Sequence, residues 1–145
     1  WRVAGVTGAE PARELIAVWR GGPEAPQMAE VAVLATRDDG LALLFQARLS
    51  TREERYAEII IEDVTDLTGD GAADVILRDR PTGQVWVLSN ASGQLALHEL
   101  PERCRGGLIA ADTDGNSQIE VIRDGCTKAG RVGAIWDGKG FALVP

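Results

Sequence analysis

The sequence predicts an all-β fold made of three four-stranded antiparallel units that resemble the blades of a β-propeller. Its apolar segments are short, often alternate with polar residues and end at Gly, Asp or Asn, which is typical of antiparallel strands. One loop-and-strand pattern occurs three times. Several strands are also apolar at consecutive positions, which indicates units that stack and bury both faces.

Length and composition indicate one domain over residues 1–145 and argue against two classes of partner. The chain has 145 residues and is 45% hydrophobic, enough for one real core. Its formal net charge of −7 argues against nucleic acid, whose binding needs clustered Lys and Arg. No apolar run approaches the ~18 residues that span a bilayer. Because the chain opens on Trp1, we expect a mature form or an excised piece of a longer protein.

The repeat is clearest around an acidic loop. When residues 6–18, 66–78 and 112–124 are aligned, Glu14 coincides with Asp74 and Glu120, and apolar residues follow each. An extended stretch precedes every loop: "RVAGV", "EIIIEDVT" and "GLIAA". These stretches and the apolar residues after the loops are the first and second strands expected in each unit.

Two further strands complete each unit. The third is expected in "EVAVLAT", "GQVWVLS" and "RVGAIW", and the fourth starts at a recurring "GLAL", "GQLAL" or "GFAL". The units cover roughly 1–50, 56–100 and 105–145. The loops begin 60 and 46 residues apart, near the roughly 40 to 50 residues of a propeller blade. The longer interval contains the charged segment 50–58, which we expect to be a solvated connection.

Two of the three loops have the oxygen-rich pattern of a calcium site. Ca²⁺ takes about six to eight oxygen ligands, and a tight loop supplies them from alternate positions 1, 3, 5, 7 and 9. In the second unit these positions are Asp66, Thr68, Asp70, Ala72 through its carbonyl, and Asp74. In the third unit they are Asp112, Asp114, Asn116, Gln118 through its carbonyl, and Glu120.

Position 6 of a calcium loop must turn sharply. It is Gly71 in the second unit, which suits a left-handed turn, and Ser117 in the third, where we expect a loop that is either slightly strained or looser. The alternative interpretation is purely structural: Gly, Asp and Asn only form hairpin turns. Two loops that match in register with a repeat favour a cation site over that interpretation.

The first loop lacks the ligands of a cation site. The first loop has Val6, Gly8, Glu10, Ala12 and Glu14 at the five positions, lacks oxygen side chains at the first two, and is expected to bind nothing.

An EF-hand needs Glu at position 12 and flanking helices. Position 12 is instead Leu77 or Arg123, in strand-like sequence.

The two acidic loops carry a resemblance to a known family. "DLTGDGAADV" (66–75) and "DTDGNSQIEV" (112–121), with "GQVWVLSNASGQ" (83–94), resemble the FG-GAP or VCBS repeats of integrin α-chain propellers and many bacterial exported proteins. The resemblance implies that the acidic loop joins the first two strands of each blade and binds Ca²⁺. Thr68 departs from the usual Asp or Asn, and the first loop is degenerate.

The two cysteines are placed for a disulfide. If the third loop is a hairpin centred near Gly115, cross-strand residue numbers add up to about 230, which pairs Cys104 with Cys126. The equivalent pair in the second unit is Glu58 and Arg80, which suits a salt bridge. A disulfide implies an oxidising compartment, and the alternative is two reduced cysteines in a cytosolic protein.

Aromatic residues and the lone histidine give little support for catalysis. Trp19, Trp86 and Trp136 are expected to be packing residues, with a sugar-stacking platform as the alternative. His98 lies on an expected outer strand without a nucleophile motif nearby, and we expect it to be exposed.

The leading hypothesis is a non-enzymatic, calcium-stabilised binding or scaffold module of an exported, extracellular, periplasmic or cell-surface protein. Its partner is an unknown protein or glycan. The alternatives are an accessory carbohydrate-binding domain of a secreted enzyme and a structural assembly domain. Three blades are fewer than the roughly four to eight of closed propellers, so self-association and neighbouring blades of a longer chain both remain open.

Overall fold

The computed structural model describes residues 1–8, 14–51, 56–90, 93–100, 106, 108–127 and 130–144, with side chains in the last sheet described up to 122 and from 133 to 143. These residues form twelve strands in three antiparallel sheets, each in sequential or reversed-sequential order. Sheet 1 contains β1 (Arg2–Ala4), β2 (Glu14–Arg20), β3 (Met28–Arg37) and β4 (Gly40–Ser50). Sheet 2 contains β5 (Ile59–Thr65), β6 (Asp74–Asp79), β7 (Val85–Ser89) and β8 (Ala96–Glu99). Sheet 3 contains β9 (Leu108–Ala111), β10 (Glu120–Thr127), β11 (Gly130–Trp136) and β12 (Phe141–Val144).

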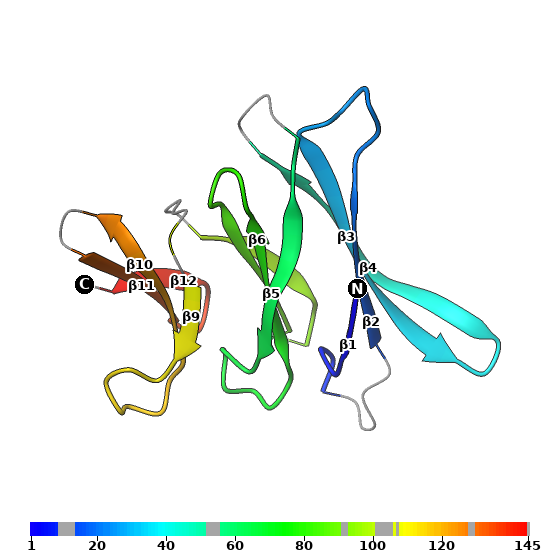
Figure 1. Ribbon diagram of the computed structural model, residues 1–145. Helices are drawn as coiled ribbons and strands as arrows, with labels where there is room; N and C mark the ends of the chain where they lie inside the picture. The colour runs from blue at the N-terminus through cyan, green and yellow to red at the C-terminus, as the bar shows by residue number, and fades with distance from the viewer. Residues whose placement is uncertain are drawn as a thin grey trace.

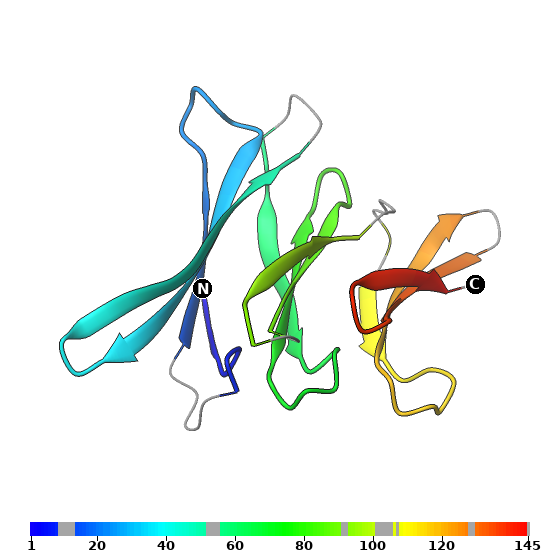
Figure 2. The same cartoon turned by 180° about the vertical axis from the view of Figure 1, so that it is seen from behind.

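The three sheets stand side by side with sheet 2 in the middle, as Figures 1 and 2 show from opposite sides. One hydrophobic core lies between sheets 1 and 2 and contains Ile16, Val31 and Leu77. A second lies between sheets 2 and 3 and contains Ile76 and Val121. The prediction of an all-β fold with three four-stranded antiparallel sheets is confirmed. The described residues form no closed ring, so the propeller arrangement stays a prediction.

The predicted repeat register is visible at the start of the second strand of each sheet. Glu14, Asp74 and Glu120, aligned from the sequence, are the first residues of β2, β6 and β10. In Figure 1 the second and third loops lie along the same edge of the stack, at the bottom of the view.

No helix in the described part of the chain is long and apolar enough to cross a membrane.

The tryptophans divide into two packing residues and one exposed residue. Trp86 is 4% exposed in the core between sheets 1 and 2. Trp136 packs against Phe141 with ring centroids 5.3 Å apart. The expectation that Trp19 also packs inside is wrong, because it is 42% exposed. Trp19 lies near the end of β2 on the face of sheet 1 that no other sheet covers.

His98 is on the outermost strand of sheet 2, as predicted, but the expectation that it is exposed is wrong. Its ring lies 5.3 Å from that of Trp136 and 5.8 Å from that of Phe141, both at steep interplanar angles. Burial lowers the pKa of His98 from its ordinary value because it disfavours the charged imidazolium. β8 is an edge strand within its sheet, but sheet 3 packs beside it.

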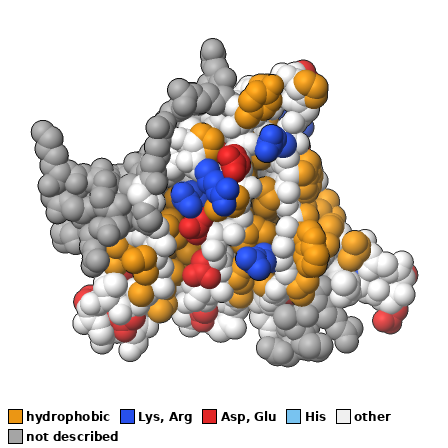
Figure 3. Space-filling model, viewed as in Figure 1, with side chains coloured by type: hydrophobic (Ala, Val, Ile, Leu, Met, Phe, Trp, Pro, Cys, Tyr) orange, Lys and Arg blue, Asp and Glu red, His pale blue; other side chains and the backbone are white. Residues whose placement is uncertain are grey.

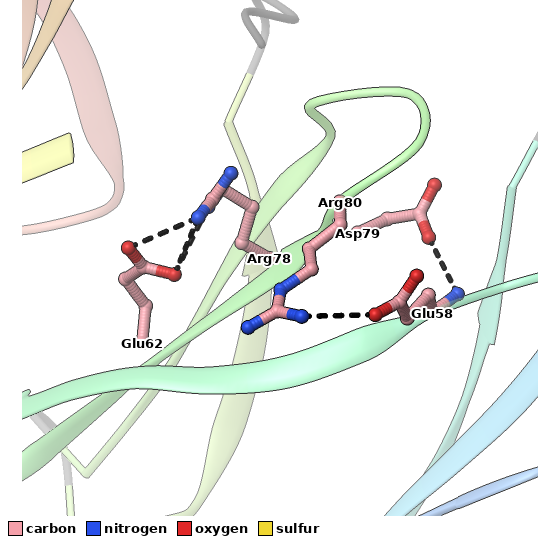
Figure 4. A network of polar contacts seen from close by, with 5 residues as sticks. All are labelled: Glu58, Glu62, Arg78, Asp79 and Arg80. Atoms are coloured by element: carbon pink, nitrogen blue, oxygen red, sulfur yellow. Dashed lines mark hydrogen bonds and ion pairs between the residues drawn. The ribbon is translucent and has the colours of Figure 1, made fainter. Parts of the chain in front are cut away.

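The predicted salt bridge of the second unit is confirmed. Arg80 Nη1 lies 3.0 Å from Glu58 Oε1, and both side chains are about half exposed (Figure 4). A pair this exposed contributes little to stability. The more buried Arg78 binds both carboxylate oxygens of Glu62 in the same sheet.

The predicted disulfide falls largely outside the described residues. Cys104 and the side chain of Cys126 are not among them. The register between β9 and β10 pairs Glu120 with Ala111 and Arg123 with Leu108, so partner numbers add up to 231, one more than the hairpin estimate. The disulfide therefore stays a prediction.

Segment 50–58, expected to be a solvated connection, is hydrogen-bonded to the protein near both of its ends. Residues 52–55 lie outside the described part, and Tyr56 is 66% exposed. However, the neighbouring Thr51 and Ala57 are buried, and their backbone N–H groups donate to carbonyls of residues 26 and 27. The expectation of a freely solvated segment is wrong at these two residues, because the β2–β3 connection binds them.

Asp79 organises the β6–β7 turn. It is fully buried, and its Oδ1 accepts the N–H of Glu58 at 2.8 Å. Its Oδ2 accepts both the N–H and the hydroxyl of Thr82 (Figure 4 shows the bond to Glu58). One carboxylate therefore connects the turn to the start of β5.

Replacing Asp79 with Ala is expected to lower the free energy of unfolding by about 2 to 4 kcal/mol, because it leaves buried donors without acceptors. Urea denaturation followed by circular dichroism measures the change. Glu24→Ala, at an exposed carboxylate, is the matched control and is expected to change stability by less than about 0.5 kcal/mol. Equal effects of the two substitutions would contradict the role given to Asp79.

Candidate metal centre

The carboxylate at position 9 of each acidic loop is buried and bonds back to position 2. Asp74 is 1% exposed, and its Oδ2 accepts the N–H of Leu67 at 2.7 Å. Glu120 is 4% exposed, and its Oε2 accepts the N–H and the hydroxyl of Thr113, each at 2.8 Å. The two loops are thus closed by the same contact across seven residues.

The first loop keeps this closing contact. Glu14 is 3% exposed, and its Oε1 accepts the hydroxyl of Thr7 at 2.6 Å, again across seven residues. Sequence reasoning did not identify the position 2 residues, although threonine at this position in two of the three loops was a usable signal.

The second oxygen of each position 9 carboxylate is buried without a hydrogen-bond partner. These atoms are Oε2 of Glu14, Oδ1 of Asp74 and Oε1 of Glu120. Thr68 Oγ1, at position 3 of the second loop, is also buried and unpartnered. A buried carboxylate oxygen costs free energy unless a donor or a cation satisfies it. Such atoms fit a metal site.

In the second loop, the aspartates at positions 1 and 5 hold the backbone in a compact turn. Asp66 accepts the N–H of Gly69 through Oδ1 at 2.7 Å and that of Gly71 through Oδ2 at 2.9 Å. Asp70 accepts the N–H of Ala72 at 2.8 Å.

The third loop repeats this arrangement residue for residue. Asp112 accepts the N–H of Gly115 through Oδ1 at 2.7 Å and that of Ser117 through Oδ2 at 2.9 Å. Asn116 accepts the N–H of Gln118 at 2.7 Å. Because every offset matches the second loop, the two loops have one backbone design, and the predicted ligand positions 1 and 5 are structurally equivalent.

The loops differ in how closely their carboxylates gather. Ligand atoms of Asp112, Asp114 and Glu120 lie within 4.8 Å of one another, and no other such trio occurs among the described residues. In the second loop position 3 is Thr68, so a third carboxylate near Asp74 is replaced by a hydroxyl. The third loop is therefore the more completely assembled site.

Burial and a neighbouring charge shift the pKa of the position 9 carboxylate in the second loop. Burial raises the pKa of Asp74 to about 6; N–H groups of Leu67 and Thr68 oppose this rise, and the charge of Asp70 adds to it. The protein alone stabilises the ionised form of Asp74 poorly. A divalent cation would supply the missing positive charge.

Some predicted site residues have no described ligand geometry. Ala72 is buried, and Gln118 is exposed in its loop, but the role of their carbonyls as ligands stays a prediction. In the first loop Glu10 and Ala12 lie outside the described residues. The buried Val6 and the glycine at Gly8 offer no side-chain oxygen, as the sequence predicts.

Neighbouring loops contact one another across the sheets. The N–H of Ala73, in the second loop, donates to the carbonyl of Gly5 at 3.1 Å. The second and third loops share a hollow of about 60 Å³ whose lining includes Asp66, Gln118 and Trp136. Each loop therefore lies in contact with the edge of a neighbouring sheet.

No family model, curated protein or solved structure matches this chain. The resemblance to FG-GAP or VCBS repeats consequently depends on the loop residues and the repeat pattern alone.

Ser117 is the one described non-glycine residue with a positive φ, 70°, and the equivalent Gly71 has φ 84°. This agrees with the strain expected at position 6. Ser117→Gly is expected to raise the free energy of unfolding by about 0.5 to 1 kcal/mol, because glycine adopts this conformation without a Cβ penalty. Thermal denaturation in chelator measures the change. Ser89→Gly, in strand β7, is the contrasting control and is expected to destabilise.

The metal-free protein is expected to lose stability as the pH rises through about 6, because Asp74 then ionises in a buried position. The folded-state pKa lies above the ordinary value of 3.8, so this stabilisation is complete below about 4 and is lost above 6. The stability difference between wild type and Asp74→Asn, measured in chelator by urea denaturation, isolates this group. It is expected to change by about 1 to 3 kcal/mol between these limits. A pH-independent difference would contradict the assignment.

Proposed function

We propose that this chain is a non-enzymatic, calcium-stabilised binding or scaffold module of an exported protein. The observation that carries the proposal is a buried carboxylate oxygen without a protein partner, Oδ1 of Asp74 and Oε1 of Glu120, in the two loops that also supply further oxygen ligands. Glu14 has the same unpartnered oxygen, but its loop lacks side-chain ligands at positions 1 and 3. The buried carboxylate belongs to the repeat, and the additional ligands distinguish the two calcium loops.

The ligand chemistry favours Ca²⁺ over other metals. The third-loop set consists of carboxylate and amide oxygens from Asp112, Asp114, Asn116 and Glu120, which are hard ligands typical of Ca²⁺. The second loop would contribute Asp66, Thr68, Asp70 and Asp74. A bound cation would neutralise carboxylates that otherwise repel one another and would stiffen the edge where neighbouring loops meet.

The export part of the proposal depends on the family resemblance and on the predicted pairing of Cys104 with Cys126. The partner is a protein or a glycan. A role as accessory carbohydrate-binding domain keeps one supporting feature, because Trp19 is exposed beside a hollow lined by Glu24, Glu30 and Arg48. Trp86, the tryptophan that would best have supported it from the sequence, is buried and unable to stack on a sugar.

Calcium is expected to raise the melting temperature, and chelation is expected to lower it. At a free concentration 100 times the dissociation constant, one site stabilises the fold by about 2.7 kcal/mol. Asp74→Asn and Glu120→Gln are each expected to remove one contribution, because each removes the buried charge but keeps an acceptor for the position 2 donor. The double variant is expected to show no calcium response. Differential scanning calorimetry and calorimetric titration measure stability and stoichiometry.

The matched control is Glu14→Gln, which changes the same structural position in the loop predicted to bind nothing. It is expected to leave the calcium response and a stoichiometry of two unchanged. Absence of a calcium-dependent shift from micromolar to millimolar concentrations in the wild type would overturn the proposal. Loss of the response in the control would overturn the assignment of sites to loops.

A further inference from the structure

Sheet 1 has one face that no other sheet covers, and the part of that face away from the Glu30, Gln46 and Arg48 side chains is apolar. Val3, Leu41 and Leu43 are 60%, 59% and 56% exposed. Figure 3 shows hydrophobic side chains gathered over the region that sheet 1 occupies in Figure 1. Exposed apolar surface of this kind commonly marks an interaction site.

Strand alternation defines the residues of this outer face. Ile16, Val31 and Val33 pack toward sheet 2, so the residues between them lie on the opposite face. Cross-strand pairing connects four outer-face residues in one row across the sheet: Val3, Leu15, Leu34 and Leu43. We call these four residues the sheet 1 outer row.

The same row is largely buried in the other two sheets, although Leu143 at its end in sheet 3 is 45% exposed. Leu15 directly follows the buried carboxylate of its repeat, as Val75 and Val121 follow theirs. The row of Val75 continues through Leu88 to Leu97 and packs against sheet 1. The equivalent row of sheet 3, which includes Val121 and Ala134, packs against sheet 2.

The repeat therefore has a front face and a back face. The row following the carboxylate is the back face, which binds the front face of the preceding sheet. Sheet 1 has apolar residues at back-face positions although no sheet precedes it in this structure. A strand whose outer face met only solvent would be expected to carry polar residues there.

Sheet 3 presents the complementary front face. Ile16 and Ile76, two residues after their carboxylates, pack on the following sheet. The equivalent Ile122 is 8% exposed although no described sheet lies in front of it, and its cross-strand partner Ile109 is 49% exposed. In the described part of the chain, sheet 1 thus has a back face without a preceding sheet, and sheet 3 has a front face without a following sheet.

We propose that the sheet 1 outer row of one copy of this chain binds the face of sheet 3 that presents Ile109 in a second copy. The contact would continue the sheet-to-sheet packing that the chain already forms twice. Each contact joins two different faces, and in a closed dimer a two-fold axis relates the two contacts, so that each copy offers sheet 1 to its partner at one contact and sheet 3 at the other. Two copies would supply six four-stranded sheets, within the roughly four to eight blades that close a propeller, so the expected assembly is a dimer closed by two such contacts.

Sedimentation equilibrium from low to high micromolar concentration, run with calcium and again with chelator, tests the proposal. The wild type is expected to form dimers in a concentration-dependent manner. Leu43→Asp and Ile109→Asp are each expected to raise the dissociation constant at least about tenfold, because each places a charge in both contacts of the dimer. Gln94→Asp adds the same charge at an exposed position of the β7–β8 connection and is expected to leave the dimer unchanged.

Mixing the two disruptive variants distinguishes a contact between sheet 1 and sheet 3 from a contact between two identical faces. In the mixture, the Ile109→Asp copy offers an intact sheet 1 and the Leu43→Asp copy an intact sheet 3, so one contact re-forms and mixed dimers are expected. Melting temperatures check that each variant stays folded.

A wild type that remains monomeric at every concentration would overturn the proposal and assign the face to another occupant, such as a further blade or a glycan at Trp19. Variants that do not complement each other on mixing would also overturn it. The outcome is separable from the calcium proposal, because the assembly depends on the apolar faces and the calcium response on the loop carboxylates.

Discussion

A buried carboxylate at the first residue of the second strand is the constraint on which each repeat depends. Glu14, Asp74 and Glu120 are nearly inaccessible to solvent, and each accepts a hydrogen bond from the residue seven positions earlier. This bond sets where the loop closes and where the next strand begins. Burying a carboxylate with one oxygen unpaired costs free energy, so another interaction has to compensate for the lost hydration. In the second and third loops a cation bound by that oxygen is the proposed compensation.

Stacking of the sheets explains why a local loop contact affects the whole chain. The middle sheet buries both faces and each outer sheet buries one, and the loops meet along one edge through the bond from Ala73 to Gly5 and the shared hollow beside Asp66. A stack of this kind is stabilised mainly by nearest-neighbour contacts. The proposed ions at the loop edge would therefore act on the same interfaces as the apolar residues between the sheets, the ions at the rim and the apolar residues in the interior. In the described part of the chain, each end of the stack has one face on which no sheet packs.

Most of the fold could be predicted because its signals are local and occur three times. Alternation and turn residues located the strands, and aligning Glu14 with Asp74 and Glu120 gave the register that the structure confirms. The loop equivalence also followed from spacing alone, including the strain at Ser117. The failures concern contacts between units. Trp19 was expected in a core and is exposed, and His98 was expected in solvent and lies against Trp136.

By itself, the sequence determined the elements, their repeat and the oxygen-bearing side chains at each loop position, because residue chemistry and spacing act within about a dozen neighbouring residues. Only the tertiary structure decided which carboxylate oxygens are buried without a partner, since this depends on sheets packing around Asp74 and Glu120. It also decided which apolar faces are covered. Leu15 and Val75 hold equivalent places in their repeats, but a preceding sheet packs against only the second of them in this structure.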